Sequence, residues 1–269
     1  MARWFCVAVT LLLASAAALA QSESEDVQQM LRLVNQERTS RGLSSLELDE
    51  RLSQAAREHS VRMAEQKKLS HQLDGEPSVQ VRLGATSVRF NRSGENVAMD
   101  SDAASAHRSL MNSPPHRANI LTPEYNAIGI AVVRRGDYVW VTQNFVHRLP
   151  TVSVDAAEDN VAQAFARMRQ SAGASPLRRV EEPRLREAAC RMAASDSINP
   201  KFANGITGAK NIVVFTATDL NKLPAQLTKL RSVYGGGYSV GACFAPSASY
   251  VNPVFWFAFV VYFPSAAQR

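Results

Sequence analysis

Three short similarities recur in the same order along the chain, and they constrain its fold more than any other feature. The matching pairs are Arg38–Leu46 with Arg169–Leu177, Leu52–Ala56 with Leu185–Ala189, and Tyr125–Gly129 before Trp140 with Tyr238–Gly241 before Trp256. Ordered self-similarity of this kind is typical of a repeated structural unit. At 269 residues with 46% apolar residues, the chain is long enough to form two hydrophobic cores. The sequence therefore predicts tandem domains over residues 21–150 and 151–269, with a short polar linker at residues 151–158.

Residues 1–20 have the pattern of a secretory signal peptide. Arg3 precedes an apolar run from Trp4 to Leu19, and Ala18-Leu19-Ala20 resembles a cleavage site with small residues. A membrane anchor is the alternative, but the run is short and ends in small residues. We expect removal of this segment and release of a monomer, with no transmembrane anchor, into the periplasm or the extracellular space.

The cysteine count and the net charge indicate the redox compartment and the class of binding partner. Cys6 lies in the signal segment, so an even number, Cys190 and Cys243, remains in an oxidising compartment. This favours one disulfide over two buried thiols. The formal net charge is +6, which in a secreted protein favours lipid head groups or an anionic envelope polymer over nucleic acid. A soluble surface rich in arginine is the preferred explanation of the charge.

Apolar periodicity predicts helices before strands in each half of the chain. A capping-box spacing at Ser22 predicts the start of the first helix, which should end near Gly42. Asp49 is the expected N-cap of the second helix, with His59 packed in the core. A third helix should begin near Asp100 or Asp102 and stop before Pro114, with His107 in solvent. The predicted strands are the hairpin of residues 127–133 and 138–146 and a buried central strand over residues 254–263.

Functional side chains are concentrated between positions 71 and 145. They are His71, Asp74, Glu95, Asn96, His116 and Gln143, and each lies near Gly, Pro or Ser, where we expect loops. Two imidazoles and a carboxylate suit a metal with an open coordination position, or an imidazole oriented by a carboxylate to act as base or hydrogen-bond donor. No HExxH, CxxC or GxSxG motif decides between them. The second half has no histidine after Cys190, so we expect it to lack this chemistry.

Four short segments of the first half of the chain resemble motifs of the CAP superfamily (cysteine-rich secretory, antigen 5 and pathogenesis-related proteins), and most closely those of its bacterial secreted branch. They are Ser70-His71, Gly94-Glu95-Asn96, Ser113-Pro114-Pro115-His116-Arg117 and the strand with Trp140, Thr142-Gln143 and Phe145. The resemblance covers residues 27–147. It implies an α+β fold of the α-β-α sandwich type, in which helical layers enclose a mainly antiparallel sheet and an open cavity. We expect two tandem copies, the second degenerate.

The resemblance also implies a set of cavity residues, and this chain lacks two of them. Eukaryotic members line the cavity with a His-Glu-Glu-His set, in which the first His corresponds to His71 and the first Glu to Glu95. The other two positions fall at or near Ser113 and Trp140, so those ligands are missing. The bacterial branch instead supplies His116. The remaining candidate ligands of a divalent metal such as zinc are therefore His71, His116 and Glu95, with Asp74 as a supporting or fourth ligand.

We expect binding as the leading function, with a divalent metal or a small apolar, lipid, sterol or envelope-derived ligand in the first cavity. His71, Asp74, Glu95 and His116 would contact that ligand, while Asn96 and Gln143 would form structural hydrogen bonds. One alternative is a metal- or His/Glu-dependent hydrolase of peptide or envelope polymer, with His116 or Glu95 as its general base. Another is an extracellular interaction module with a vestigial cavity.

Overall fold

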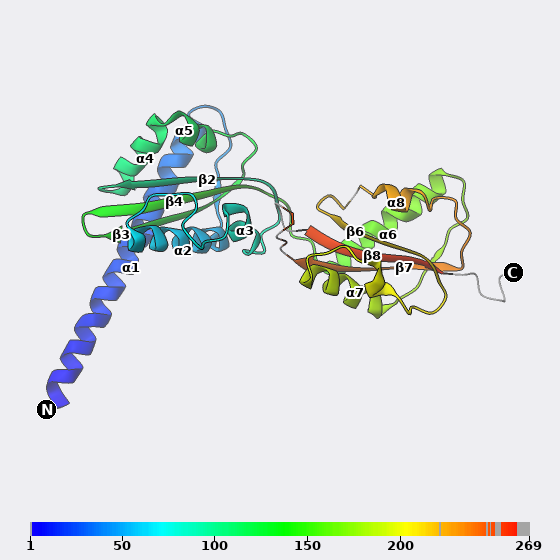
Figure 1. The fold of residues 1–269 in the computed structure, drawn as a ribbon. Coiled ribbons are helices and arrows are strands. Elements are labelled where there is room, and N and C mark those ends of the chain that lie inside the picture. Colours follow the sequence, from blue (N-terminus) through cyan, green and yellow to red (C-terminus); the bar gives the residue numbers. More distant parts are fainter. Residues whose placement is uncertain (1, 221, 246, 248, 251–253, 263–269) are drawn as a thin grey trace. The chain divides into compact units, whose positions relative to one another are not determined.

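The computed structural model describes the backbone of residues 2–220, 222–245, 247, 249–250 and 254–262, and side chains from residue 21 onward within these ranges (Figure 1). The chain forms two compact units, Met1–Leu149 and Pro150–Arg269. Each unit contains one four-stranded sheet with helices packed against it. Among the described residues, no helix combines the length and the apolar character needed to cross a membrane.

The first unit is an α-β-α sandwich built on one mixed sheet. Its helices are α1 (Ala2–Thr39), α2 (Glu50–Gln66), α3 (Val79–Gly84), α4 (Ala103–Asn112) and α5 (Pro114–Ile120). Its strands are β1 (Glu47–Leu48), β2 (Phe90–Asp100), β3 (Ala127–Arg135) and β4 (Tyr138–Arg148). The strand order is β1-β3-β4-β2, and only the β1–β3 pairing is parallel. Strand β2 therefore forms one edge of the sheet.

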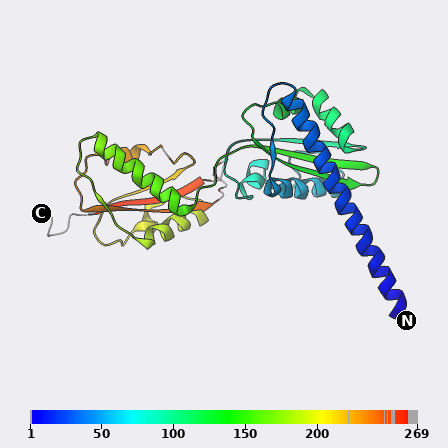
Figure 2. The same cartoon turned by 180° about the vertical axis from the view of Figure 1, so that it is seen from behind.

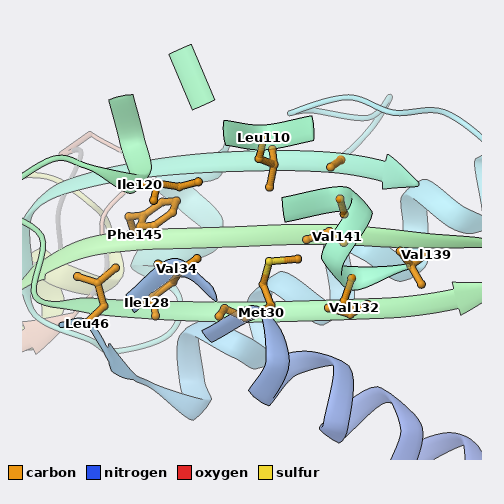
Figure 3. Packing of buried hydrophobic residues seen from close by; sticks show 14 of the residues in the cluster. Met30, Val34, Leu46, Leu110, Ile120, Ile128, Val132, Val139, Val141 and Phe145 are labelled. Atoms are coloured by element: carbon orange, nitrogen blue, oxygen red, sulfur yellow. The ribbon is translucent and has the colours of Figure 1, made fainter. Parts of the chain in front are cut away.

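Residues in β4 alternate between the two helical layers. Val141 and Phe145 point toward α1 and α4, where they join Met30 and Val34 in the main core (Figure 3). Trp140 points to the opposite face and belongs to the cluster beside α2. This period of two buries both faces of the strand, and each fully buried large apolar side chain contributes roughly 1.5–3 kcal/mol relative to exposure.

The second unit has its own sheet, with the order β5-β7-β8-β6. Its helices are α6 (Val154–Ser171), α7 (Pro183–Ala194), the 3-10 helix η1 (Pro200–Ala203) and α8 (Ala225–Thr228). Its strands are β5 (Arg178–Arg179), β6 (Ala209–Ala217), β7 (Gly237–Ala245) and β8 (Val254–Tyr262). As predicted, β8 is a buried central strand, and Figure 2 shows α6 crossing the sheet of this unit. A disulfide joins Cys190 on α7 to Cys243 on β7, which confirms the predicted pairing.

Corresponding arginines perform the same structural task in the two units. The buried Arg38 at the end of α1 donates hydrogen bonds to the backbone carbonyls of four residues: Ser44, Ile120, Thr122 and Tyr125. The buried Arg169 at the end of α6 donates to the carbonyls of Ser175, Leu230, Arg231 and Val233. Each guanidinium therefore ties a helix end to the loop that follows it and to a second segment that is distant in sequence.

Several predictions about elements are confirmed and others are wrong. Asp49 is the N-cap of α2, Asp102 is the N-cap of α4, and β3 and β4 form the expected hairpin. The first helix does not begin at Ser22, because α1 is continuous from Ala2. The linker predicted at residues 151–158 is also wrong, because α6 begins at Val154. The signal peptide remains a prediction, since Met1 and the side chains of residues 2–20 lie outside the described part of the chain.

Candidate functional site

His71 and Glu95 form the centre of the candidate site. His71 lies in the segment between α2 and α3, and Glu95 lies on the edge strand β2, which the sequence had indicated as a loop. The His71 Nδ1 is 3.0 Å from the Glu95 Oε1. The side chain of Glu95 is 3% exposed and that of His71 is 57% exposed. The hydrogen bond to Glu95 raises the pKa of His71, against the opposing effect of burial.

Arg82 on α3 fixes the Glu95 carboxylate from the other side. Its guanidinium donates to the Glu95 Oε2 at 2.7 Å, to the Glu76 Oε1 at 3.2 Å and to the His71 backbone carbonyl at 3.0 Å. The Glu76 Oε1 is also 2.9 Å from the Nδ1 of His59, which is buried as predicted. These five side chains form one continuous network: His59, Glu76, Arg82, Glu95 and His71.

His116 lies on α5, which starts at Pro114 shortly after α4, and its ring lies near that of His71. A side-chain amide holds its backbone in place, since the Asn96 Nδ2 donates to the His116 carbonyl at 3.1 Å. The same nitrogen lies 3.1 Å from the Gln143 Oε1, and Asn119 donates to the Asn96 Oδ1 at 2.9 Å. Asn96 and Gln143 therefore take structural roles, while Asn119 is a supporting residue that the sequence analysis missed.

The imidazole rings of His71 and His116 lie with centroids 6.3 Å apart and planes inclined by 39°. Among the described residues, neither the His71 Nε2 nor either ring nitrogen of His116 has a hydrogen-bond partner. Burial, followed by the nearby His71, lowers the pKa of His116. The pair therefore combines a His71 that is readily protonated with a His116 that is neutral at neutral pH.

Residues 31–145 match the model of the CAP family, described as the cysteine-rich secretory protein family. The first unit belongs to the CAP superfamily. This CAP unit is similar to YkwD of Bacillus subtilis, an uncharacterized protein (33% identity over 118 residues, 44% of this chain and 45% of the relative). It is also similar to YlbC of the same organism, an uncharacterized membrane protein (35% over 129 residues, 48% of this chain and 36% of the relative). The chain thus spans less than half the length of these relatives.

A solved structure of an extracellular Bacillus anthracis protein with an SCP domain is also similar to this chain. It is 30% identical, with a TM-score of 0.45, and the match covers 48% of this chain and 42% of that chain. The two Bacillus subtilis relatives agree with the bacterial branch of the superfamily, as the motifs predicted. Their names assign no ligand to it.

Asp74 is not brought into the site of the CAP unit. Its side chain is 95% exposed, and its Oδ1 lies 3.7 Å from the Lys68 Nζ. A turn at Gly75, where φ is +72°, separates it from the buried Glu76. The carboxylate that enters the network after His71 is therefore Glu76, two residues beyond the predicted one.

The residues of the CAP unit do not fit a three-ligand metal centre as they are arranged. Both Glu95 oxygens are occupied, one by His71 and the other by the Arg82 cation. Within the described part of the chain, no group of three His, Cys, Asp or Glu side chains is placed to hold a metal ion. His71 and His116 remain as a pair of imidazoles with open nitrogens.

Two cavities of the CAP unit lie elsewhere. One of about 300 Å³ lies between α1, α2 and β3, and another of about 400 Å³ lies between α2 and α3. Arg82 lines the second, but neither cavity is lined by His71 or His116. The His71 side chain is exposed and His116 is half-buried, so the pair lies at the surface of the CAP unit.

Proposed function

We propose that the chain is exported and that its CAP unit binds a small amphipathic, envelope-derived ligand through His71 and His116. The observation that carries this proposal is the pair of tilted imidazoles, with centroids 6.3 Å apart, beside a fully hydrogen-bonded carboxylate; the His71 Nε2 and both His116 ring nitrogens have no partner among the described residues. Such a pair can donate hydrogen bonds to an acidic or carbonyl oxygen of a ligand.

The local electrostatics favour an oxygen-bearing head group. Glu95 accepts the Nδ1 proton of His71, so the His71 Nε2 becomes a donor when the ring is protonated. Arg82 offsets the charge of Glu95, which leaves the protonated His71 available to a ligand anion. Two exposed apolar residues adjoin this network in sequence, Leu69 at 49% and Val81 at 39% exposure. They would contact the apolar part of an amphipathic ligand.

Hydrolysis with Glu95 as the general base is less well supported by the same contacts. A general base needs an oxygen or nitrogen free to take a proton from water. Both oxygens of Glu95 are engaged, and Arg82 would have to move before Glu95 could serve as that base. The hydrolase alternative therefore rests on His116, whose ring nitrogens have no hydrogen-bond partner among the described residues.

The test is a titration of the full chain with palmitate, followed by NMR at the histidine Hε1 protons and by calorimetry. Palmitate should shift the His71 and His116 signals, and His71→Ala/His116→Ala should weaken its affinity at least tenfold, about 1.4 kcal/mol. His147→Ala is the matched control, because His147 lies outside the pair, and it should bind like the wild type. An unchanged affinity in the double variant would sink the proposal.

A second titration, with zinc chloride, separates the metal alternative. Stoichiometric zinc binding by the wild type that disappears in His71→Ala/His116→Ala would assign the pair to a metal instead of an amphipathic ligand.

Glu95→Gln tests the hydrogen bond that holds His71. It should lower the pKa of His71, because the hydrogen bond to Glu95 is the largest contribution to the raised value.

A further inference from the structure

One cavity of the second unit lies beside strand β7. It encloses about 610 Å³ and is bounded by α6, α7, the end of β5, and Val240 and Gly241 of β7. Strand β5 pairs with only two residues of β7, so beyond Tyr238 the edge of β7 has no neighbouring strand. The cavity lies where this short strand ends.

Backbone hydrogen bonds show which groups of β7 face the cavity. The Tyr238 carbonyl accepts from the Val180 N–H at 2.8 Å, and the Ala242 N–H donates to the Glu158 Oε1 at 2.9 Å. Alternate residues of a strand direct their N–H and C=O to the same side, so the backbone groups of Val240 face this edge too. Neither group has a hydrogen-bond partner among the described residues. Val240 therefore presents an unpaired donor and an unpaired acceptor.

The two units differ in the number of residues between the last residue that pairs with the short edge strand and the glycine that contacts the helix. In the CAP unit, Ile128 pairs with β1, and the next residue, Gly129, lies against Leu52 of α2. In the second unit, Tyr238 pairs with β5, but the residue that lies against α7 is Gly241, three positions later. Two additional residues uncover about 7 Å of strand edge, at roughly 3.3 Å per residue. The opening is thus a feature of the second unit.

Negative charge predominates around this edge, although the whole chain is basic. The cavity is lined by five carboxylates, Asp155, Glu158, Asp159, Glu181 and Glu182, and by two arginines. Both arginines are paired with three of these carboxylates, Arg186 with Glu158 at 2.9 Å and Asp155 at 2.5 Å and Arg179 with Asp159 at 2.5 Å, so two positive charges offset part of the five negative ones. Asp155 and Asp159 are exposed at the rim.

We infer that this cavity binds an extended basic polypeptide segment, which adds a strand to β7 at Val240. Main-chain hydrogen bonds to Val240 would supply the pairing, as in other cases of strand addition to a free sheet edge. Lysine or arginine side chains of the segment would lie near Asp155 and Asp159. The occupant is a separate chain of positive charge, and this binding does not depend on the His71–His116 pair.

The probe is the pentapeptide acetyl-KVKVK-amide, titrated into the isotope-labelled full chain. The Val240 amide resonance should shift, and its hydrogen exchange should slow, because a new hydrogen bond protects it. The acidic peptide acetyl-EVEVE-amide should produce no shift. The same peptide N-methylated at its central lysine keeps all three charges but lacks the central N–H, so its affinity should fall at least tenfold.

Surface variants complete the test without disturbing the core. Asp155→Asn/Asp159→Asn should weaken acetyl-KVKVK-amide binding at least fivefold. Glu187→Gln, an exposed carboxylate of α7 outside the cavity, should leave it unchanged. An unshifted Val240 amide at millimolar peptide would overturn the inference. So would equal binding of acetyl-EVEVE-amide or of the N-methylated peptide.

Discussion

His107 on α4 is 4% exposed, and both of its ring nitrogens lack a hydrogen-bond partner in the described part of the chain. The sequence placed this residue in solvent, which is wrong, because its face of α4 packs against α1. Burial lowers the pKa of His107, with Glu37 acting against this effect and Arg108 adding to it. The Glu37 Oε1 lies 4.0 Å from the Nε2. His107 is therefore neutral in the folded protein at neutral pH.

This lowered pKa predicts a loss of stability in acid. Below the unfolded value of about 6.5, the unfolded chain binds the His107 proton more readily than the folded chain, so stability falls as the pH drops. His107→Leu should remove this loss and be more stable than the wild type at pH 5, by roughly 1 kcal/mol more than at pH 8. Urea unfolding at both pH values measures the difference.

The control for that comparison is His147→Leu, which should retain the acid sensitivity of the wild type. His71 affects the pH dependence of stability in the opposite direction, because its raised pKa contributes stability at low pH that is lost as the pH rises through the folded value. This contribution is the same in the wild type, His107→Leu and His147→Leu. Parallel pH profiles for the wild type and His107→Leu would contradict the assignment.

At the scale of elements, one glycine in each unit sets how closely a helix approaches its sheet. A Cβ atom on Gly129 would lie 2.2 Å from the Leu52 carbonyl carbon of α2. A Cβ atom on Gly241 would lie 2.3 Å from the Arg186 nitrogen of α7. Both contacts involve helix backbone, which cannot move as a flexible side chain would. The helix–sheet distance in each unit therefore requires glycine.

Gly129→Ala should destabilise the CAP unit by roughly 3 kcal/mol, the upper end of overpacking costs. Gly136→Ala, at the β3–β4 turn, provides a comparison without crowding, since its Cβ would meet nothing within 4 Å. Its φ of +60° limits the expected cost to about 1 kcal/mol. Chemical denaturation of both variants measures the two costs, and equal values would show that crowding against α2 is not the cause.

At the scale of the whole molecule, the two units share a strand order and a buried arginine at a helix end. They differ in the histidine pair of the CAP unit and the disulfide of the second unit. Arg38 and Arg169 make matching sets of bonds to carbonyls, and Gly129 and Gly241 make matching helix contacts. These correspondences support our proposal that the second unit is a degenerate copy of the CAP unit. Within the described residues, the disulfide lies in the second unit.

The disulfide predicts separate stability of the two units. Cys190→Ser/Cys243→Ser should destabilise the second unit by about 2–4 kcal/mol, because the bond constrains its unfolded chain. The transition of the CAP unit should not move. Scanning calorimetry, with the tryptophan signal of Trp140 and Trp256 to assign the transitions, measures both effects. A common shift of both transitions would show that the units unfold together.

Local sequence determined much of this protein. Motif spacing identified the CAP unit and predicted His71, Glu95 and His116, which the structure brings together, because loops and edge strands keep such motifs short and continuous. Periodicity predicted the hairpin and the central strand β8, and cysteine parity predicted the disulfide. These features depend on neighbours in sequence, or on residue types that have few alternative partners.

Only the tertiary structure decided how these residues are paired. Arg82 binds Glu95 and Glu76, and Asp74 turns to solvent, because the α3 helix and the turn at Gly75 set directions that spacing does not encode. The burial of His107 follows from the packing of α4 on α1, and the open edge at Val240 follows from a two-residue difference in register. Such contacts join elements far apart in the chain, and their geometry is fixed only when both cores are packed.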